Sequence, residues 1–382
     1  MPVSDYDSAS FVGRNDIVDE VIRRALTTPA LIRSLLIEGP ANRGKSWVLC
    51  RTHEKLIDPA AVASIIPNSP PVAICLYSSD DARPFEPLRL VASVWWALHP
   101  YFPSLFWPTG LPDTTIKDTA IQALHSFFRQ NNFDAQSLLS VATQDLDTAS
   151  PPILLVLLVD GLDEFDQLDA FERQFVEPLF RSPNVRVVAS RRSHVHTARW
   201  TTFSLRPKKD GSINLDRLNA HDAEDQITRH FGRCGSPLTY AELNASIKHY
   251  AWQNPGANRR FADCAIEKQV TQRLITSDNV RSCLLQLSTS GRFSNPISDN
   301  DFDWLTAVVK HFPSIGSSEV PAHALNAVLE ATAQRPVGDF ERNEWLGRLQ
   351  DRAIVMRRNS GQCLVHDEFA ALCQEWEAQR TL

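Results

Sequence analysis

The chain has 382 residues, of which 43% are hydrophobic and 22% are charged, and its formal net charge is -6. This length predicts two or three domains, and the composition excludes a disordered or fibrous chain. The acidic balance disfavours a protein whose main task is to coat nucleic acid, because neutralisation of phosphates supplies most of that affinity. The longest aliphatic run, Ile153 to Val159, is far shorter than the ~20 residues that span a bilayer.

The cysteines and the N-terminus indicate a cytoplasmic protein. The seven cysteines are odd in number and no two have C-x-x-C spacing, so we expect reduced thiols rather than disulfides or a zinc site. The first seven residues are acidic and lack the apolar core of a signal peptide. We therefore expect no membrane association.

Strands and helices alternate in the first half of the chain. Short apolar runs predict strands at 35–38, 72–77, 153–159 and 185–189. Helical spacing predicts helices at 45–57, 86–98, 116–130 and 167–180. This alternation predicts a three-layer α/β domain with a parallel sheet and right-handed crossovers, which we place at residues 1–205.

The second half of the chain is mainly helical. Helical spacing without strand signals predicts a small helical domain at 206–290, with helices at 222–233, 239–251, 257–275 and 278–288. The last domain, 301–382, has predicted helices at 302–311, 321–333 and 340–351. Two β-like runs, 353–357 and 362–365, and a final helix follow. Three helices before a hairpin is the order of a winged helix.

A phosphate-binding motif lies between the first predicted strand and the helix after it. Residues 39–46 match G-x-x-x-x-G-K-[ST] in full. The glycines let backbone N–H groups point at phosphate oxygens, and the helix N-terminus favours anions. We expect Lys45 to reach the β- and γ-phosphates and Ser46 to hold magnesium. The expected cradle is Gly39, Pro40, Ala41, Asn42, Arg43, Gly44, Lys45, Ser46 and Trp47.

An acidic motif follows the aliphatic run 153–159, in the sequence Asp160-Gly-Leu-Asp163-Glu164. A buried strand that ends in an aspartate is what a Walker B element requires. We expect Asp160 to bind the magnesium shell, with Asp163 sharing that role. Glu164 would act as the base or water-positioning group for attack on the γ-phosphate. The alternative is an acidic turn after a core strand.

A basic tip, Ser190-Arg191-Arg192, follows the strand predicted at 185–189. Arg191 is placed to sense the γ-phosphate from the neighbouring strand. The alternative for this segment is a solvated basic turn.

With the segment Val12-Gly13-Arg14, these motifs resemble the STAND class of AAA+-related P-loop NTPases, which contains the NACHT and NB-ARC signalling proteins. The resemblance extends from about residue 10 to 375. It implies a site for ATP or ADP with Mg²⁺ to which Val12, Gly13 and Arg14 contribute.

Two C-terminal segments also resemble elements of this class. Asn254-Pro255 falls where the family has a Gly-x-Pro element whose proline packs near the adenine, although Gln253 replaces the glycine. Val365-His366-Asp367 looks like the Met-His-Asp motif, with a valine for the methionine. The resemblance implies that His366 meets the nucleotide in a closed ADP state. The alternative is a winged-helix histidine without a ligand.

The resemblance implies a slow ATPase that acts as a signalling switch, in defence or stress by analogy. ATP would hold the winged helix away and permit oligomerisation, and ADP would close it. Only ten residues precede Phe11, so we expect either separate effector and sensor proteins or a fragment of a longer chain. Homo-oligomers are the other expected partners.

Two other hypotheses stay open. The first is a DNA-acting AAA+ ATPase, whose winged helix would grip duplex DNA through Arg348, Arg352, Arg357 and Arg358. Acidic residues interleave with these arginines, and the overall charge disfavours this role. The second is a scaffold that binds nucleotide without hydrolysis, against which the complete motifs argue.

Overall fold

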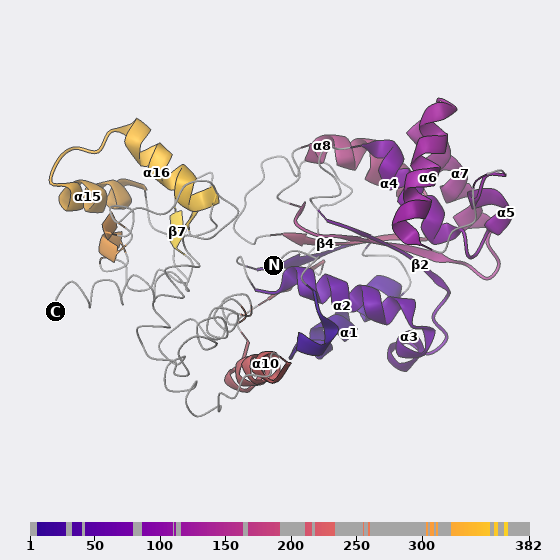
Figure 1. Ribbon diagram of the computed structural model, residues 1–382, viewed down its shortest axis with the longest axis horizontal. Coiled ribbons are helices and arrows are strands. Elements are labelled where there is room, and N and C mark those ends of the chain that lie inside the picture. The colour runs from indigo at the N-terminus through magenta and orange to yellow at the C-terminus, as the bar shows by residue number, and fades with distance from the viewer. Residues whose placement is uncertain are drawn as a thin grey trace.

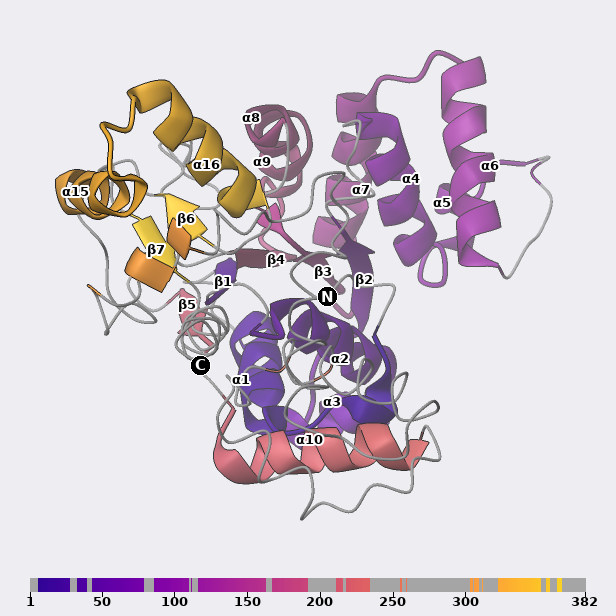
Figure 2. The same ribbon diagram turned by 60° about the vertical axis from the view of Figure 1, so that its left-hand side comes forward.

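A five-stranded parallel sheet forms the centre of the first half of the chain, with the strand order β2-β3-β4-β1-β5 (Figure 2). The strands are β1 (Ser34–Glu38), β2 (Val72–Tyr77), β3 (Leu154–Val159), β4 (Val185–Arg191) and β5 (Ser212–Asn214). The structure is a computed structural model that describes residues 6–27, 33–39, 43–78, 86–109, 111, 116–162, 167–191, 211–215, 218–233, 255, 259, 303–304, 306–308, 311, 322–351, 355–357 and 363–365.

Helices cover both faces of the sheet and make three layers (Figure 1). One face carries α1 (Asn15–Leu26), α2 (Lys45–Ile57) and α3 (Pro59–Ile65). The other carries α4 (Pro87–Leu98), α5 (Pro103–Phe106), α6 (Lys117–Gln130), α7 (Ala135–Thr148), α8 (Leu168–Phe171), a π-helical turn (Glu172–Val176) and α9 (Glu177–Leu179). The predicted α/β class is confirmed.

Strand β3 explains why two layers of helices are needed. All six of its residues are buried, and alternate residues belong to different cores. Leu155 and Leu157 face the α4–α9 layer, whereas Val156 and Leu158 face α1–α3. A strand with two apolar faces is stable only when both are covered, as is usual in parallel sheets.

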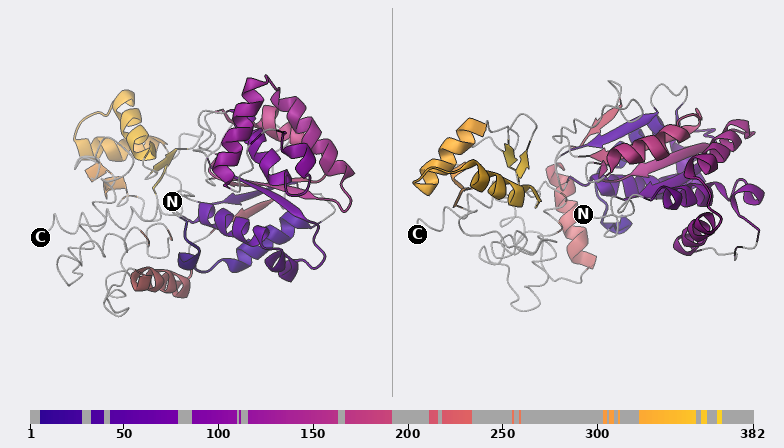
Figure 3. Two further views of the ribbon diagram at one scale, coloured as in Figure 1. Left: turned by 45° about the vertical axis from the view of Figure 1, so that its right-hand side comes forward. Right: turned by 90° about the horizontal axis from the view of Figure 1, so that it is seen from above.

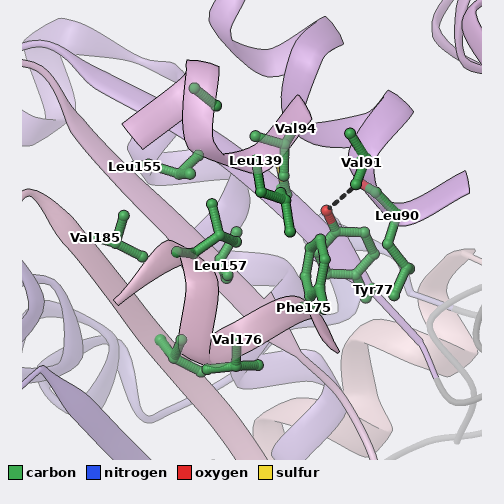
Figure 4. Packing of buried hydrophobic residues seen from close by; sticks show 14 of the residues in the cluster. Tyr77, Leu90, Val91, Val94, Leu139, Leu155, Leu157, Phe175, Val176 and Val185 are labelled. Atoms are coloured by element: carbon green, nitrogen blue, oxygen red, sulfur yellow. Dashed lines mark hydrogen bonds between the residues drawn. The ribbon is translucent and has the colours of Figure 1, made fainter. Parts of the chain in front are cut away.

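The core on the α4–α9 side joins strand and helix residues tightly (Figure 4). The hydroxyl of Tyr77, at the end of β2, donates a hydrogen bond to the Leu90 carbonyl at 3.1 Å. Its ring meets Phe175 edge to face, with centroids 5.6 Å apart. A buried tyrosine needs such a partner for its hydroxyl, so Tyr77 fixes α4 against the sheet.

The long connection between β2 and β3 is a group of helices with an aromatic centre. Trp95 on α4 packs edge to face against Phe106 and Phe128, with centroid separations of 5.0 and 5.1 Å. Both phenylalanines are fully buried. Trp95, Phe106 and Phe128 of this aromatic-rich stretch are therefore core residues.

Beyond β4, the structure extends the sheet further than predicted. Strand β5 pairs with β1 at residues 212–214, past residue 205, where we expected the domain to end. Its three residues are half-buried or exposed, so they lack the apolar run that marks a strand. The predicted helix 167–180 is interrupted by the π-helical turn, and α1, α3 and α7 were not predicted.

The described remainder contains α10 (Ala220–Arg233), α15 (Ala322–Ala333), α16 (Asp339–Asp351) and the antiparallel pair β6 (Val355–Arg357) and β7 (Cys363–Val365). Helices α15 and α16 and the hairpin lie apart from the sheet (Figure 3). Their order agrees with the predicted elements, and the winged-helix assignment stays a prediction. The other expected helices lie largely outside the described residues, among which no helix is long and apolar enough for a membrane span.

The aromatic core predicts the energetic cost of one truncation. We expect Phe128→Ala to lower the free energy of unfolding by about 3–5 kcal/mol, because it leaves a large cavity beside Trp95. The matched control is Phe340→Ala, since Phe340 is 83% exposed and Phe128 is fully buried. Denaturant unfolding of both variants measures the difference. A similar small effect for both would contradict this account of the core.

Candidate nucleotide-binding site

The phosphate-binding motif joins β1 to α2. Strand β1 ends at Glu38 and α2 begins at Lys45, with Gly44 as its N-cap at a φ of 80°. Such a positive φ is strained for residues with a Cβ, so this turn favours glycine. Residues Pro40, Ala41 and Asn42 lie outside the described residues. The helix start is placed to offer N–H groups to an anion.

The side chain of Lys45 lies back over the motif. Its Nζ donates a hydrogen bond to the Gly39 carbonyl at 3.0 Å. Gly39 is buried and close to β5, since an added Cβ would lie 2.9 Å from the Leu215 carbonyl oxygen. The ammonium group is thus held where the two ends of the loop meet.

The segment Val12-Gly13-Arg14 connects this loop to α10. Arg14 NH1 donates a hydrogen bond to the Arg43 carbonyl. Gly13 has a φ of 63°, and a Cβ there would lie 2.6 Å from the Asp222 carboxylate. Asp222 is fixed by a reciprocal cap, since its N–H donates to Asn219 and its carboxylate accepts from the Asn219 amide. Glycine is therefore required for the close approach of α10.

Pro255 also lies at the phosphate-binding loop. It is buried, and its ring lies 3.7 Å from the position of a Cβ added to Gly44. Gln226 on α10 donates a hydrogen bond to the Pro255 carbonyl at 3.2 Å. The proline that the resemblance placed near the adenine is thus brought against the loop, together with α10.

A small pocket lies beside the first turn of α2. It is lined by Ser10, Trp47, Gln226, Ile227, His230 and Arg259. The guanidinium carbon of Arg259 lies 5.2 Å from the centroid of the Trp47 ring. The buried indole N–H of Trp47 has no hydrogen-bond partner among the described residues. The pocket therefore combines an aromatic face with a buried polar donor.

Asp160 lies at the carboxyl end of β3 and is 9% exposed. Its Oδ1 accepts a hydrogen bond from Ser190 Oγ at 2.5 Å, and Ser190 Oγ accepts one from the Gly161 N–H at 2.9 Å. Burial raises the pKa of Asp160, while hydrogen bonds from Ser190 and Ser46 and the charge of Lys45 act in the opposite direction.

The donor set around Asp160 fits Mg²⁺. Carboxylate and hydroxyl oxygens are the ligands that this cation prefers, usually few in number and completed by water and phosphate. Asp160 and Ser46 provide such oxygens from adjacent elements. Among the described residues, no group of three histidines, cysteines, aspartates or glutamates forms a complete protein cage. Asp163 and Glu164 lie outside the described residues.

Arg191 ends β4 next to the last residue of β1. Its Nε donates a hydrogen bond to Glu38 Oε1 at 2.5 Å, and NH2 contacts the same oxygen. The two side chains are 20% and 13% exposed, so the pair is mostly buried. Arg191 therefore lies at the carboxyl end of a central strand, and it is not a solvated turn residue.

Direct contacts join several members of the predicted site: Arg14 with Arg43 and Gly44, Gly44 with Pro255, Lys45 with Gly39, and Asp160 with Ser46 and Lys45. The described members Val12, Gly13, Trp47 and Arg191 lie on adjoining segments. His366 lies outside the described residues. Sequence reasoning missed Glu38, Ser190, Asp222 and Gln226. Glu38 and Ser190 adjoin predicted site residues at strand ends, which is the signal that identifies them. Asp222 and Gln226 become visible only through the packing of α10.

The close approach at Gly13 predicts a local defect. We expect Gly13→Ala to destabilise the protein by about 1–3 kcal/mol and to loosen α10, because it combines backbone strain with a clash at Asp222. Hydrogen exchange of α10 amides measures the effect. Gly338→Ala is the control, since no atom lies within 4 Å of a Cβ added there. Unchanged α10 exchange in Gly13→Ala would contradict this packing.

Comparison with known proteins identifies the fold. The chain matches no protein-family model and no curated protein. It is similar to a Walker-type ATPase of Pyrococcus abyssi, with a TM-score of 0.53 and 12% identity over 95% of this chain and 96% of that one. It is also similar to the ORC2 protein of Aeropyrum pernix (TM-score 0.46, 11% identity, 95% and 93% covered) and to the RuvB branch migration motor of Thermotoga maritima (0.44, 12%, 99% and 98%). The core therefore has the fold of a Walker-type ATPase.

Proposed function

We propose that this protein is an ATP-dependent switch that binds Mg-ATP, hydrolyses it slowly and couples its nucleotide state to oligomerisation or to a partner. The observation that carries this proposal is the meeting of three elements at one sheet edge. Lys45 and Ser46 begin α2, Asp160 directly follows β3 and Arg191 ends β4. An intact set of these groups supports turnover rather than a scaffold that only binds.

The residues at this edge have complementary tasks. Lys45 and the N–H groups at the start of α2 provide positive charge for a polyphosphate. Ser46 and Asp160 would hold Mg²⁺, which supplies charge neutralisation between the β- and γ-phosphates when it is bound. Arg191 would contact the γ-phosphate, the group that distinguishes ATP from ADP. Glu164, by its sequence position, is the proposed base.

Coupling to the rest of the chain is supported by the contacts of α10 and Pro255. Gly44 allows Pro255 to approach the phosphate-binding loop, and Gly13 allows α10 to approach the segment whose Arg14 bonds to that loop. A shift in this loop on loss of the γ-phosphate would therefore move α10 and Pro255 as well. Such differential contacts are what a nucleotide switch requires. Pro255, which lies against the loop, is the proposed neighbour of the adenine.

The C-terminal unit leaves a second class of function to be tested. The hairpin after α16 suits a DNA-bound winged helix as well as a switch that closes on the nucleotide. Two described arginines near the start of α16 are engaged by acidic residues, Arg335 by Glu341 and Arg342 by Asp339. Such pairing lowers the positive potential that duplex DNA would meet, so the switch is preferred.

The switch predicts that assembly depends on nucleotide. We expect a larger particle with a slowly hydrolysed ATP analogue and magnesium than with ADP, because only ATP provides the γ-phosphate. Size-exclusion chromatography with light scattering measures the mass in each state. Lys45→Ala should bind neither nucleotide and should stay in the smaller form. A monomer in every state, together with a salt-sensitive gel shift on duplex DNA, would favour the DNA-acting ATPase.

The hydrogen bond from Ser190 predicts a specific effect on magnesium. We expect Ser190→Ala to weaken the magnesium-dependent part of ATP affinity roughly tenfold, because Asp160 loses the donor that orients it. Calorimetric titrations with magnesium and with EDTA separate this part from the rest. Ser140→Ala is the control, because Ser140 is exposed and its hydroxyl donates a hydrogen bond to the Gln136 carbonyl of its own helix. Equal losses with and without magnesium would argue against a metal role for Asp160.

A further inference from the structure

The last residue of β1, Glu38, carries a negative charge directly before the phosphate-binding motif. Lys45 bonds to the Gly39 carbonyl, one residue further along, so this carboxylate is close to the region meant for phosphates. An uncompensated carboxylate would repel a polyphosphate there. Its side chain is only 13% exposed, so solvent screens it poorly. The negative charge of Glu38 at this position therefore needs a positively charged partner.

The partner of Glu38 is fixed by the sheet. Glu38 and Arg191 are aligned in the parallel register of β1 and β4, each at the carboxyl end of its strand. Nε and NH2 of the guanidinium both contact Oε1 of Glu38. Contact through one edge restrains the rotation of a long side chain that otherwise has many rotamers.

We propose that Glu38 is a positioning residue that orients Arg191 toward the γ-phosphate and so sets the preference for ATP over ADP. The inference rests on the proposed function, since it takes Arg191 as the γ-phosphate contact. A guanidinium has five N–H donors in a fixed plane, so a carboxylate on one edge aims the opposite edge. Here β4 lies between β1 and β3, so Arg191 ends its strand between the strand that leads into the phosphate-binding loop and the strand that leads into Asp160.

The test compares affinities for a slowly hydrolysed ATP analogue and for ADP, both with magnesium. We expect Glu38→Ala to weaken ATP binding roughly tenfold and to leave ADP binding unchanged, because only the γ-phosphate contact loses its orientation. Glu38→Gln keeps an acceptor oxygen at the same place, so it should retain most of the ATP preference. Glu20→Ala, which breaks an exposed ion pair on α1, is the matched control.

A double-mutant cycle separates this role from other effects. If Glu38 acts through Arg191, adding Glu38→Ala to Arg191→Ala should cause no further loss of ATP affinity. Tighter binding of both nucleotides in Glu38→Ala and Glu38→Gln would instead mean simple charge repulsion and would overturn the proposal. An equal loss for ATP and ADP would mean a structural role and would also overturn it.

The same data distinguish failure of this inference from failure of the proposed function. If wild-type protein binds neither nucleotide, the proposed function fails. If Arg191→Ala lowers ATP affinity but Glu38→Ala does not, only the positioning role of Glu38 fails. Thermal unfolding without nucleotide checks that each variant is folded. If Glu38→Ala is not folded, the affinities of Glu38→Gln for ATP and ADP are compared instead.

Discussion

The position of β4 between β1 and β3 is the constraint on which the site depends. Because the three strands are parallel, their carboxyl ends lie at one edge, and each supplies a different group: the phosphate-binding loop, Ser190 with Arg191, and Asp160. The Ser190–Asp160 hydrogen bond ties two of these strands, and Glu38–Arg191 ties the other pair. Rigid elements place these groups more accurately than loops would.

Burial sets both the strength and the cost of this arrangement. The apolar cores on both faces of β3 keep water from the strand ends, so charges there interact strongly. The same burial raises the pKa of Asp160, while the hydrogen bonds from Ser190 and Ser46 and the charge of Lys45 oppose this shift. The buried polar groups of the site therefore depend on one another, and removal of one hydrogen-bond partner leaves the other group with one partner fewer.

Much of the first half of the fold could be predicted from the sequence, because its signals are local. The bounds of α2 and β2 agree with prediction, and the buried strand β3 was recognised by its aliphatic run. Strand β5 was missed because its stability comes from pairing with β1 rather than from apolar residues. Asp222, the partner of Gly13, was missed for a related reason: a close approach between distant segments leaves no periodic pattern.

These close approaches connect the phosphate-binding motif to distant parts of the chain. Gly44 is the N-cap of α2, and the side chains of Arg14 and Pro255, which are distant in the sequence, both lie beside it. Arg14 bonds to the loop, and Pro255 is held by Gln226 of α10. Arg14, Pro255 and α10 are therefore linked to the phosphate-binding loop by direct contacts. These contacts are the physical reason to expect that nucleotide binding changes the packing of these segments and does not only fill the site.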